Sequence, residues 1–234
     1  MNLLLMAIAP ICVVVIYIYV KDKYDKEPKR LLLLSFICGA LVSILITTLL
    51  YKGFDYVLPL SNHFSIQELF IKAFFVVGLT EEFSKYIIVR YVSQPRKAFN
   101  EPFDGIIYAV MVSMGFAATE NIMYVLQGGY EVAIVRAFSA VPAHATFAIL
   151  MGYFMGTAKF SNRRVLFNLF GLFLAIIFHG AYDFFLFIDF IPGVWIGTGI
   201  SLLIGLFLSR KAIQIHQEDS RQKTFKKFRR RRES

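Results

Sequence analysis

The sequence predicts an all-α membrane protein, a polytopic bundle of about seven transmembrane helices. Hydrophobic residues make up 57% of the 234 residues, and the mean hydropathy is +0.61. Charged residues make up only 18%, below the roughly 25% of ordinary soluble domains. Several apolar stretches follow one another, each close to the length of about 20 residues that a helix needs to cross the hydrocarbon core.

The expected spans follow the apolar stretches along the chain. The first lacks a positively charged start and a small-residue cleavage site, so we interpret it as a retained helix rather than a secretion signal. Ser65 and Glu68 form a capping box that places the start of the third span just after Ser65. In the fifth span, Gly152 and Gly156 favour close helix packing. The predicted spans are residues 3–20, 31–51, 66–91, 105–126, 132–157, 165–187 and 192–208.

The distribution of basic residues predicts the orientation of the bundle. Residues 21–30 hold five Lys or Arg, residues 90–97 three, residues 159–164 three and residues 210–232 ten, together 21 of the 25. All four segments fall on the same side of a seven-span bundle. Because Lys and Arg are enriched in cytoplasmic loops, we expect the N-terminus outside and the C-terminus in the cytoplasm.

The C-terminal segment is strongly basic with interleaved aromatic residues. We expect a transmembrane domain of residues 1–209 followed by a disordered cytoplasmic tail of residues 210–234. The tail is expected to dock on anionic lipid, at about 1 kcal/mol per basic residue near the surface. Nucleic acid is not an expected partner despite the net charge of +9, because the basic residues are spread over loops on one side of the membrane.

Two adjacent glutamates, Glu81 and Glu82, lie near the middle of the third span. A charged side chain at this depth costs roughly 2.5–3.5 kcal/mol on insertion scales, so ionisable residues in spans are functional candidates. Lys85 lies one turn from Glu81 on the same helix face. The later spans add Glu120, Asn121, His144, His179 and Asp183.

These polar residues can meet. At a rise of 1.5 Å per residue, their positions in four spans fall in the middle and outer half of the membrane, where one polar cavity can hold them all. His179 and Asp183 are four residues apart and share a helix face. A network of ion pairs that only joins helices is the alternative, but the excess of carboxyl groups over cations favours a site.

The residue types limit the chemistry of such a site. The chain has neither a Gly-x-Ser-x-Gly nucleophile motif nor a His-Glu-x-x-His zinc motif, so carboxylates and imidazoles remain. A glutamate can act as general base toward water, and a histidine can donate to a developing oxyanion, which indicates a hydrolase. The same side chains are competent ligands for a divalent metal such as zinc. The candidate ligands are Glu81, Glu82, Glu120, His144, His179 and Asp183.

The order of these motifs resembles the PrsW family of bacterial intramembrane proteases, which is similar to the CAAX-protease group of glutamate-type membrane peptidases. The resemblance rests on Glu81-Glu82-x-x-Lys85, Phe116-x-x-x-Glu120-Asn121, a lone His144 and His179-x-x-x-Asp183, on successive helices. The segment 21–28 and Asp104-Gly105 at the fourth span also resemble that family. The similarity covers essentially the whole chain up to the tail.

The resemblance implies roles for these residues. Glu81 would be the base that activates water, Glu82 its partner, and Glu120 a residue that holds the water. His179 would stabilise the oxyanion. The supporting residues would be Lys85, Asn121, His144 and Asp183. No cofactor is required on this reading, and a metal-dependent reaction is the alternative.

The resemblance also implies a place in biology. We expect a multi-pass protein of the bacterial cytoplasmic membrane that makes the site-1 cut in a single-pass anti-sigma factor, so activating a sigma factor under envelope or antimicrobial-peptide stress. Three alternatives stay open: a transporter or proton-coupled exchanger, a non-catalytic binding protein, and a CAAX-type processing peptidase. The absence of an internal repeat in the sequence argues against the transporter.

Overall fold

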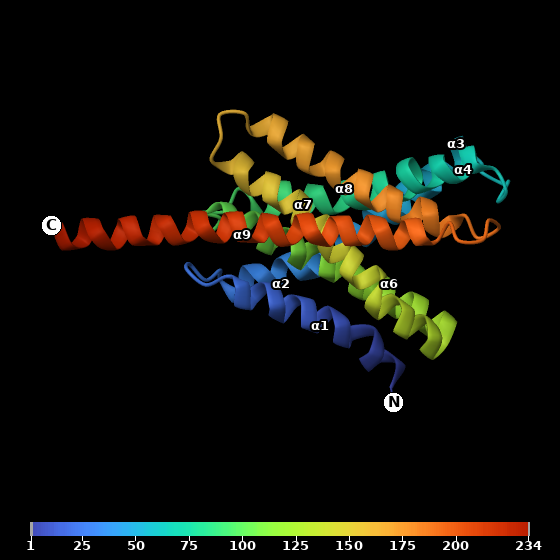
Figure 1. The fold of residues 1–234 in the computed structure, drawn as a ribbon, viewed down its shortest axis with the longest axis horizontal. Helices are drawn as coiled ribbons and strands as arrows, with labels where there is room; N and C mark the ends of the chain where they lie inside the picture. Colours follow the sequence, from blue (N-terminus) through green and yellow to red (C-terminus); the bar gives the residue numbers. More distant parts are fainter. Residues whose placement is uncertain (1, 234) are drawn as a thin grey trace.

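The computed structural model describes residues 2–233, with side chains as far as Lys223. Within this range the fold is all-α, as the sequence predicts, and the helices lie roughly along one direction (Figure 1). Short π-helical turns interrupt the second and third helical segments. The elements are α1 Leu3–Lys21, α2 Lys29–Cys38, η1 Gly39–Ser43, α3 Ile44–Val57, α4 Ile66–Ile71, η2 Lys72–Gly78, α5 Leu79–Ile88, η3 Val89–Ser93, α6 Pro102–Phe138, α7 Ala140–Lys159, α8 Arg164–Phe187 and α9 Ile196–Glu233.

Five helical segments among the described residues are long and apolar enough to cross a membrane: Leu3–Lys21, Lys29–Val57, Pro102–Lys159, Arg164–Phe187 and Ile196–Lys223. The predicted third span is not one of them, because its apolar run is interrupted by Glu81, Glu82 and Lys85. The predicted fourth and fifth spans fall together in Pro102–Lys159. The protein is therefore a multi-pass membrane protein, whereas seven crossings and the direction of insertion stay predictions.

The boundary between α6 and α7 differs from the prediction. Gly129 has φ 70°, a left-handed conformation that glycine adopts readily, and α6 changes direction there. Residues 132–138, predicted to open the fifth span, instead form the last part of α6, and α7 begins at Ala140. Pro142 then lies in the first turn of α7, where its missing N–H leaves no helical bond unmade.

α9 continues unbroken past residue 209, the predicted end of the transmembrane domain, and runs beyond the other helices (Figure 1). The physical reason is a stripe of buried residues at a spacing of three or four, which docks this part of α9 on the bundle. The stripe consists of Ser209, Ala212, Ile213, His216 and Ser220.

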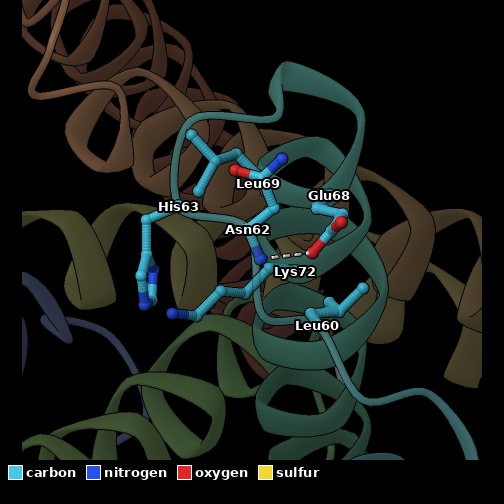
Figure 2. Close-up of a pocket in the computed structure, with 6 residues that line it drawn as sticks. All are labelled: Leu60, Asn62, His63, Glu68, Leu69 and Lys72. Carbon is cyan, nitrogen blue, oxygen red and sulfur yellow. Dashed lines mark hydrogen bonds between the residues drawn. The ribbon is translucent and has the colours of Figure 1, made fainter.

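The start of α4 lies where the sequence places it. The Ser65 side chain accepts a hydrogen bond from the Glu68 backbone N–H at 3.3 Å. The Glu68 carboxylate does not return to Ser65 and instead accepts from the Asn62 N–H at 2.9 Å. Figure 2 shows this contact in a small surface pocket that His63 and Lys72 also line. The capping box is therefore half formed, and the loop before α4 is tied to the helix by Glu68.

α6 is the central helix, and glycines let its neighbours approach its backbone. A Cβ added at Gly105 would lie 2.3 Å from the Gly152 carbonyl oxygen and 2.6 Å from the Gly156 Cα, so α6 and α7 touch backbone to backbone. The predicted close packing at Gly152 and Gly156 is confirmed. On another side of α6, a Cβ at Gly115 would lie 2.0 Å from the Phe36 carbonyl oxygen of α2. These backbone contacts fix the axial positions of α2 and α7 along α6.

The loop between α1 and α2 places two carboxyl groups in the interior. Asp22 and Glu27 are only 1% and 4% exposed. Asp22 accepts a hydrogen bond from the Glu27 backbone N–H at 3.2 Å, and Glu27 accepts one from the Tyr108 hydroxyl on α6. Burial raises the pKa of the Glu27 carboxyl from 4.5 to about 7, and it also raises the pKa of Asp22. Glu27 therefore joins this loop to α6, and burial favours the protonated form of both carboxyl groups.

Gly152→Ala should destabilise the protein by about 1–3 kcal/mol, because its Cβ would meet the α6 backbone and force the two helices apart. Gly53→Ala is the matched control, since nothing lies within 4 Å of a Cβ added there and alanine is the better helix former. Thermal unfolding in detergent measures both variants. Equal unfolding midpoints for the two variants would contradict the backbone contact.

Stability should fall as the pH rises from about 5 to 8. Over this interval folded Glu27 still binds a proton that the unfolded chain, with its ordinary pKa of 4.5, has released, so raising the pH favours unfolding. The unfolding midpoint of the wild type and of Glu27→Gln, measured across this range, tests the assignment. Glu27→Gln keeps an acceptor for Tyr108 and should flatten the pH dependence, whereas an unchanged slope would show that Glu27 is not its source.

Candidate active site

Four helices bring the intramembrane polar residues of the sequence into direct contact. We call this group the polar cluster, and all its members except Glu120 are at most 8% exposed. The contacts within the cluster join residues from four elements that are distant in sequence. The cluster consists of Glu81, Glu82 and Lys85 on α5, Glu120 on α6, His144 on α7, and His179 and Asp183 on α8.

Lys85 lies at the centre of the polar cluster and is completely buried. Its Nζ is 2.7 Å from Glu82 Oε1, 3.3 Å from Glu81 Oε2 and 3.3 Å from His144 Nδ1. An ammonium group has three hydrogens to donate, and these three partners use all of them. The ammonium also lies 4.2 Å from the centre of the Phe116 ring, a cation–π contact. One lysine therefore compensates two neighbouring carboxylates from within their own helix.

The contact with Lys85 determines the tautomer of His144. Lysine can only donate, so His144 Nδ1 accepts and its Nε2 carries the hydrogen. That Nε2 lies 2.8 Å from Glu120 Oε2, and His144 therefore donates to Glu120. A hydrogen-bonded path leads from Glu82 through Lys85 and His144 to Glu120, and it joins three helices.

Glu120 has a second partner that the sequence did not assign to the site. Arg136 Nη2 lies 2.7 Å from Glu120 Oε2. The two residues are 16 positions apart, which would be about 24 Å along a straight helix. The turn at Gly129 brings the last part of α6 back to make this contact. In the sequence, the isolated basic residue Arg136 near the end of an apolar span was the feature that could have indicated an acidic partner inside the bundle.

Asn121 supports the polar cluster from outside. Its side-chain oxygen accepts from Arg136 Nε at 2.6 Å, and its NH₂ group donates to the Ala7 carbonyl oxygen of α1 at 2.9 Å. Asn121 thus fixes Arg136 against α1. Its hydrogen bond with Arg136 connects it to the cluster.

His179 bridges the two helices that carry most of the acids. Its Nδ1 is 2.8 Å from Glu82 Oε1, and its Nε2 is 3.3 Å from Asp183 Oδ2 and 3.9 Å from Glu81 Oε2. Carboxylates only accept, so Nδ1 donates to Glu82 and Nε2 carries a hydrogen toward Asp183, which makes the ring an imidazolium. The ring stacks on Phe147 with centroids 4.8 Å apart, which fixes its plane. The Nε2 edge of His179 therefore faces the Glu81 carboxylate.

Glu81 is held on both of its oxygens. Oε2 faces Lys85 and His179, and Oε1 accepts a hydrogen bond from the Tyr51 hydroxyl of α3 at 2.8 Å. Tyr51 was not among the site residues predicted from the sequence. Its signal was a spacing of four residues from Ser43 through Thr47 to Tyr51, which gives one face of the second span a polar character.

The polar cluster contains residues of the types that bind divalent metals. Glu81, Glu82 and His179 form one group with ligand atoms within 4.8 Å of one another, and Glu81, Glu120 and His144 form another. Oε2 of Glu82 is buried and has no hydrogen-bond partner, so one carboxylate oxygen is unsatisfied. These ligand types fit zinc. Lys85 contacts members of both groups, and its ammonium supplies positive charge in the same place.

The geometry fits acid–base chemistry on water. A held carboxylate, Glu81, lies beside an imidazole N–H donor, and both are shielded from bulk solvent. Charged groups act more strongly where water is excluded, because the local dielectric is low. The cluster thus offers a base and a donor side by side, which is what hydrolysis of an amide by water needs.

Comparison with known proteins identifies relatives over most of the chain. The family described as PrsW family intramembrane metalloprotease matches residues 27–209. The protein named Protease PrsW of Oceanobacillus iheyensis is 38% identical over 187 residues, which cover 80% of this chain and 83% of the relative. The protein of the same name from Bacillus subtilis is 37% identical over 181 residues, 76% of this chain and 80% of the relative. That from Geobacillus kaustophilus is 36% identical over 186 residues, 79% and 80% respectively.

No solved structure matches the chain. The family match extends over most of the length of the chain and includes every residue of the polar cluster. The relatives cover about four fifths of the chain at more than a third identity. The protein therefore belongs to the PrsW family of intramembrane proteases.

Proposed function

We propose that this protease makes the first cut in a single-pass anti-sigma factor of the bacterial cell membrane, and so activates a sigma factor under envelope stress. The observation that carries the proposal is Glu81, a buried carboxylate held on both oxygens beside the imidazole of His179. The apolar helices around it fit a substrate that reaches the site from within the bilayer as a helix. The anti-sigma factor and the stress signal follow from the family resemblance.

In the proposed reaction, Glu81 takes a proton from water as the water oxygen attacks the carbonyl carbon of the substrate peptide bond. His179 donates a hydrogen bond to the oxyanion that forms. When the carbon–nitrogen bond breaks, the proton held by Glu81 passes to the leaving amine, so the carboxylate is restored. Glu82 and Lys85 keep His179 and Glu81 in place.

Glu120 and His144 form the second half of the proposed site. Arg136 and His144 both contact one oxygen of Glu120, which leaves its position fixed while the other oxygen is available to water. Asp183 holds the Nε2 side of His179. These contacts support Glu120 as the residue that orients water and Asp183 as the residue that orients His179.

A divalent metal would be held by Glu81, Glu82 and His179 or by Glu81, Glu120 and His144. When bound, it would polarise the substrate carbonyl and activate water. We propose that the reaction does not require it, because the Lys85 ammonium already contacts carboxylates of both groups. Glu81 belongs to both groups and is needed in either case.

Glu81→Gln should reduce cleavage at least about 100-fold, because an amide cannot act as a general base. The assay uses purified full-length protein in detergent and a tagged single-pass anti-sigma factor from the same organism. Glu131→Gln, an exposed glutamate of α6 outside the polar cluster, is the matched control and should cleave like the wild type. Full cleavage by Glu81→Gln would refute the role proposed for Glu81.

Cleavage by the wild type should persist after treatment with a strong chelator and removal of the chelator–metal complex. Metal content is measured on the same sample by elemental analysis, so that tightly held metal is detected directly. Loss of cleavage on chelation, with recovery on adding zinc, would contradict the metal-free reaction. It would assign the two groups of possible ligands to a metalloprotease.

A further inference from the structure

α2 and α3 present a line of polar side chains to the helix that carries the paired glutamates. Ser35 Oγ lies 3.0 Å from Ser93 Oγ, and Ser43 Oγ lies 2.6 Å from Ser84 Oγ. Thr47 donates to the same Ser84 Oγ at 2.9 Å. As the residue number rises along α2 and α3, the number of the partner falls, so the two segments are antiparallel.

These contacts fix the register of α3 against α5. Ser35, Ser43, Thr47, Ser84 and Ser93 are all at most 4% exposed, and hydrogen bonds between buried helices in a membrane typically contribute about 0.6–1.7 kcal/mol each. Over most of its length, this line of hydrogen bonds therefore serves to pack the segment of α2 and α3 against the segment of α5. We call this packing contact the joint between α3 and α5. The members of the line between Ser43 and Tyr51 recur every four residues, which is one face of a helix.

Tyr51 is the last member of this line, and its partner is different. Whereas Thr47 binds a serine, Tyr51 binds the carboxylate of Glu81 at Oε1 with a distance of 2.8 Å. The same serine, Ser84, donates its hydroxyl hydrogen to the Glu81 backbone carbonyl at 2.8 Å. α3 thus contacts the side chain of Glu81 directly through Tyr51 and reaches its backbone through Ser84.

The hydrogen bond from Tyr51 gives the two carboxylate oxygens of Glu81 different partners. With Oε1 engaged by Tyr51, Oε2 is the oxygen that faces Lys85 at 3.3 Å and His179 Nε2 at 3.9 Å. Without the hydroxyl, only the longer contacts of Oε2 with Lys85 and His179 restrain rotation of the carboxyl group about its last side-chain bond, so the direction of Oε2 is less strictly fixed. A misplacement of about 1 Å at a reacting group can cost 100-fold in rate.

We propose that Tyr51 is a positioning residue for catalysis, which orients Glu81 so that Oε2 takes the proton from water. The inference rests on the proposed role of Glu81 as the base. Tyr51 acts through Glu81 and is not assigned a contact with the substrate.

The chain offers two controls for this residue. Tyr56 lies on the same helix but is 90% exposed, so Tyr56→Phe removes the same hydroxyl away from the site. Thr47→Val removes a neighbouring member of the polar line that contacts Ser84 and not the Glu81 carboxylate. The first control tests the chemistry of the substitution, and the second tests the joint between α3 and α5.

The experiment measures kcat, KM and the unfolding midpoint of full-length protein in detergent, with the tagged anti-sigma factor as probe. Tyr51→Phe should lower kcat about 10- to 100-fold, with KM within about twofold and the unfolding midpoint near that of the wild type. Thr47→Val should lower the unfolding midpoint and leave kcat nearly unchanged. Tyr56→Phe should match the wild type in all three quantities.

Glu81→Gln is measured alongside, which separates the two proposals. If Glu81→Gln is inactive while Tyr51→Phe keeps the wild-type kcat, the positioning role of Tyr51 is refuted and the role of Glu81 stands. If Tyr51→Phe and Thr47→Val lose kcat and stability equally, Tyr51 is only part of the joint and the inference is again refuted. If Glu81→Gln cleaves normally, the proposed function fails, and the inference fails with it.

Discussion

The structure depends on the neutralisation of buried carboxylates by Lys85. Two adjacent glutamates on one helix repel each other and lose their hydration when they are buried, so each needs a partner. Lys85 provides it from the same helix, one turn away, and is itself completely buried. Because removing one partner from a buried ion pair leaves an uncompensated charge, the lysine and both glutamates must be placed together. The remaining contacts of the polar cluster extend from this group of three.

Contacts of two kinds fix the positions of the helices around Lys85 relative to one another. Glycine contacts bring α2 and α7 against the backbone of α6, which sets where Glu120 and His144 lie relative to each other. Hydroxyl contacts to Ser84 join α3 to α5, and the Tyr51 hydroxyl binds the Glu81 carboxylate. Lipid provides no hydrophobic force between apolar helices, so close backbone packing and interhelical hydrogen bonds must supply the attraction. The precision of the site therefore comes from small and polar residues.

The family match and the polar cluster involve the same residues. The residues of the polar cluster, which gave most of the family resemblance, lie in contact with one another, although they are spread over about 100 positions of the chain. Arg136 and Tyr51 extend the group at opposite ends, one at Glu120 and the other at Glu81. Tyr51 binds Oε1 of Glu81 and leaves Oε2 directed toward Lys85 and His179, whereas Arg136 shares Oε2 of Glu120 with His144. The cluster is thus held from outside as well as from within.

The sequence by itself determined the membrane class, the helical fold and the polar residues of the site. Long apolar stretches exclude other folds in lipid, and charges inside such stretches are too costly to be incidental. Only the tertiary structure decided the turn at Gly129, the docking of α9 and the addition of Tyr51 and Arg136 to the site. Tyrosine and arginine near the ends of spans are common as interfacial residues, so their type and position did not separate them from anchors. Their role follows from which buried group lies within hydrogen-bond distance, and that depends on how distant helices pack.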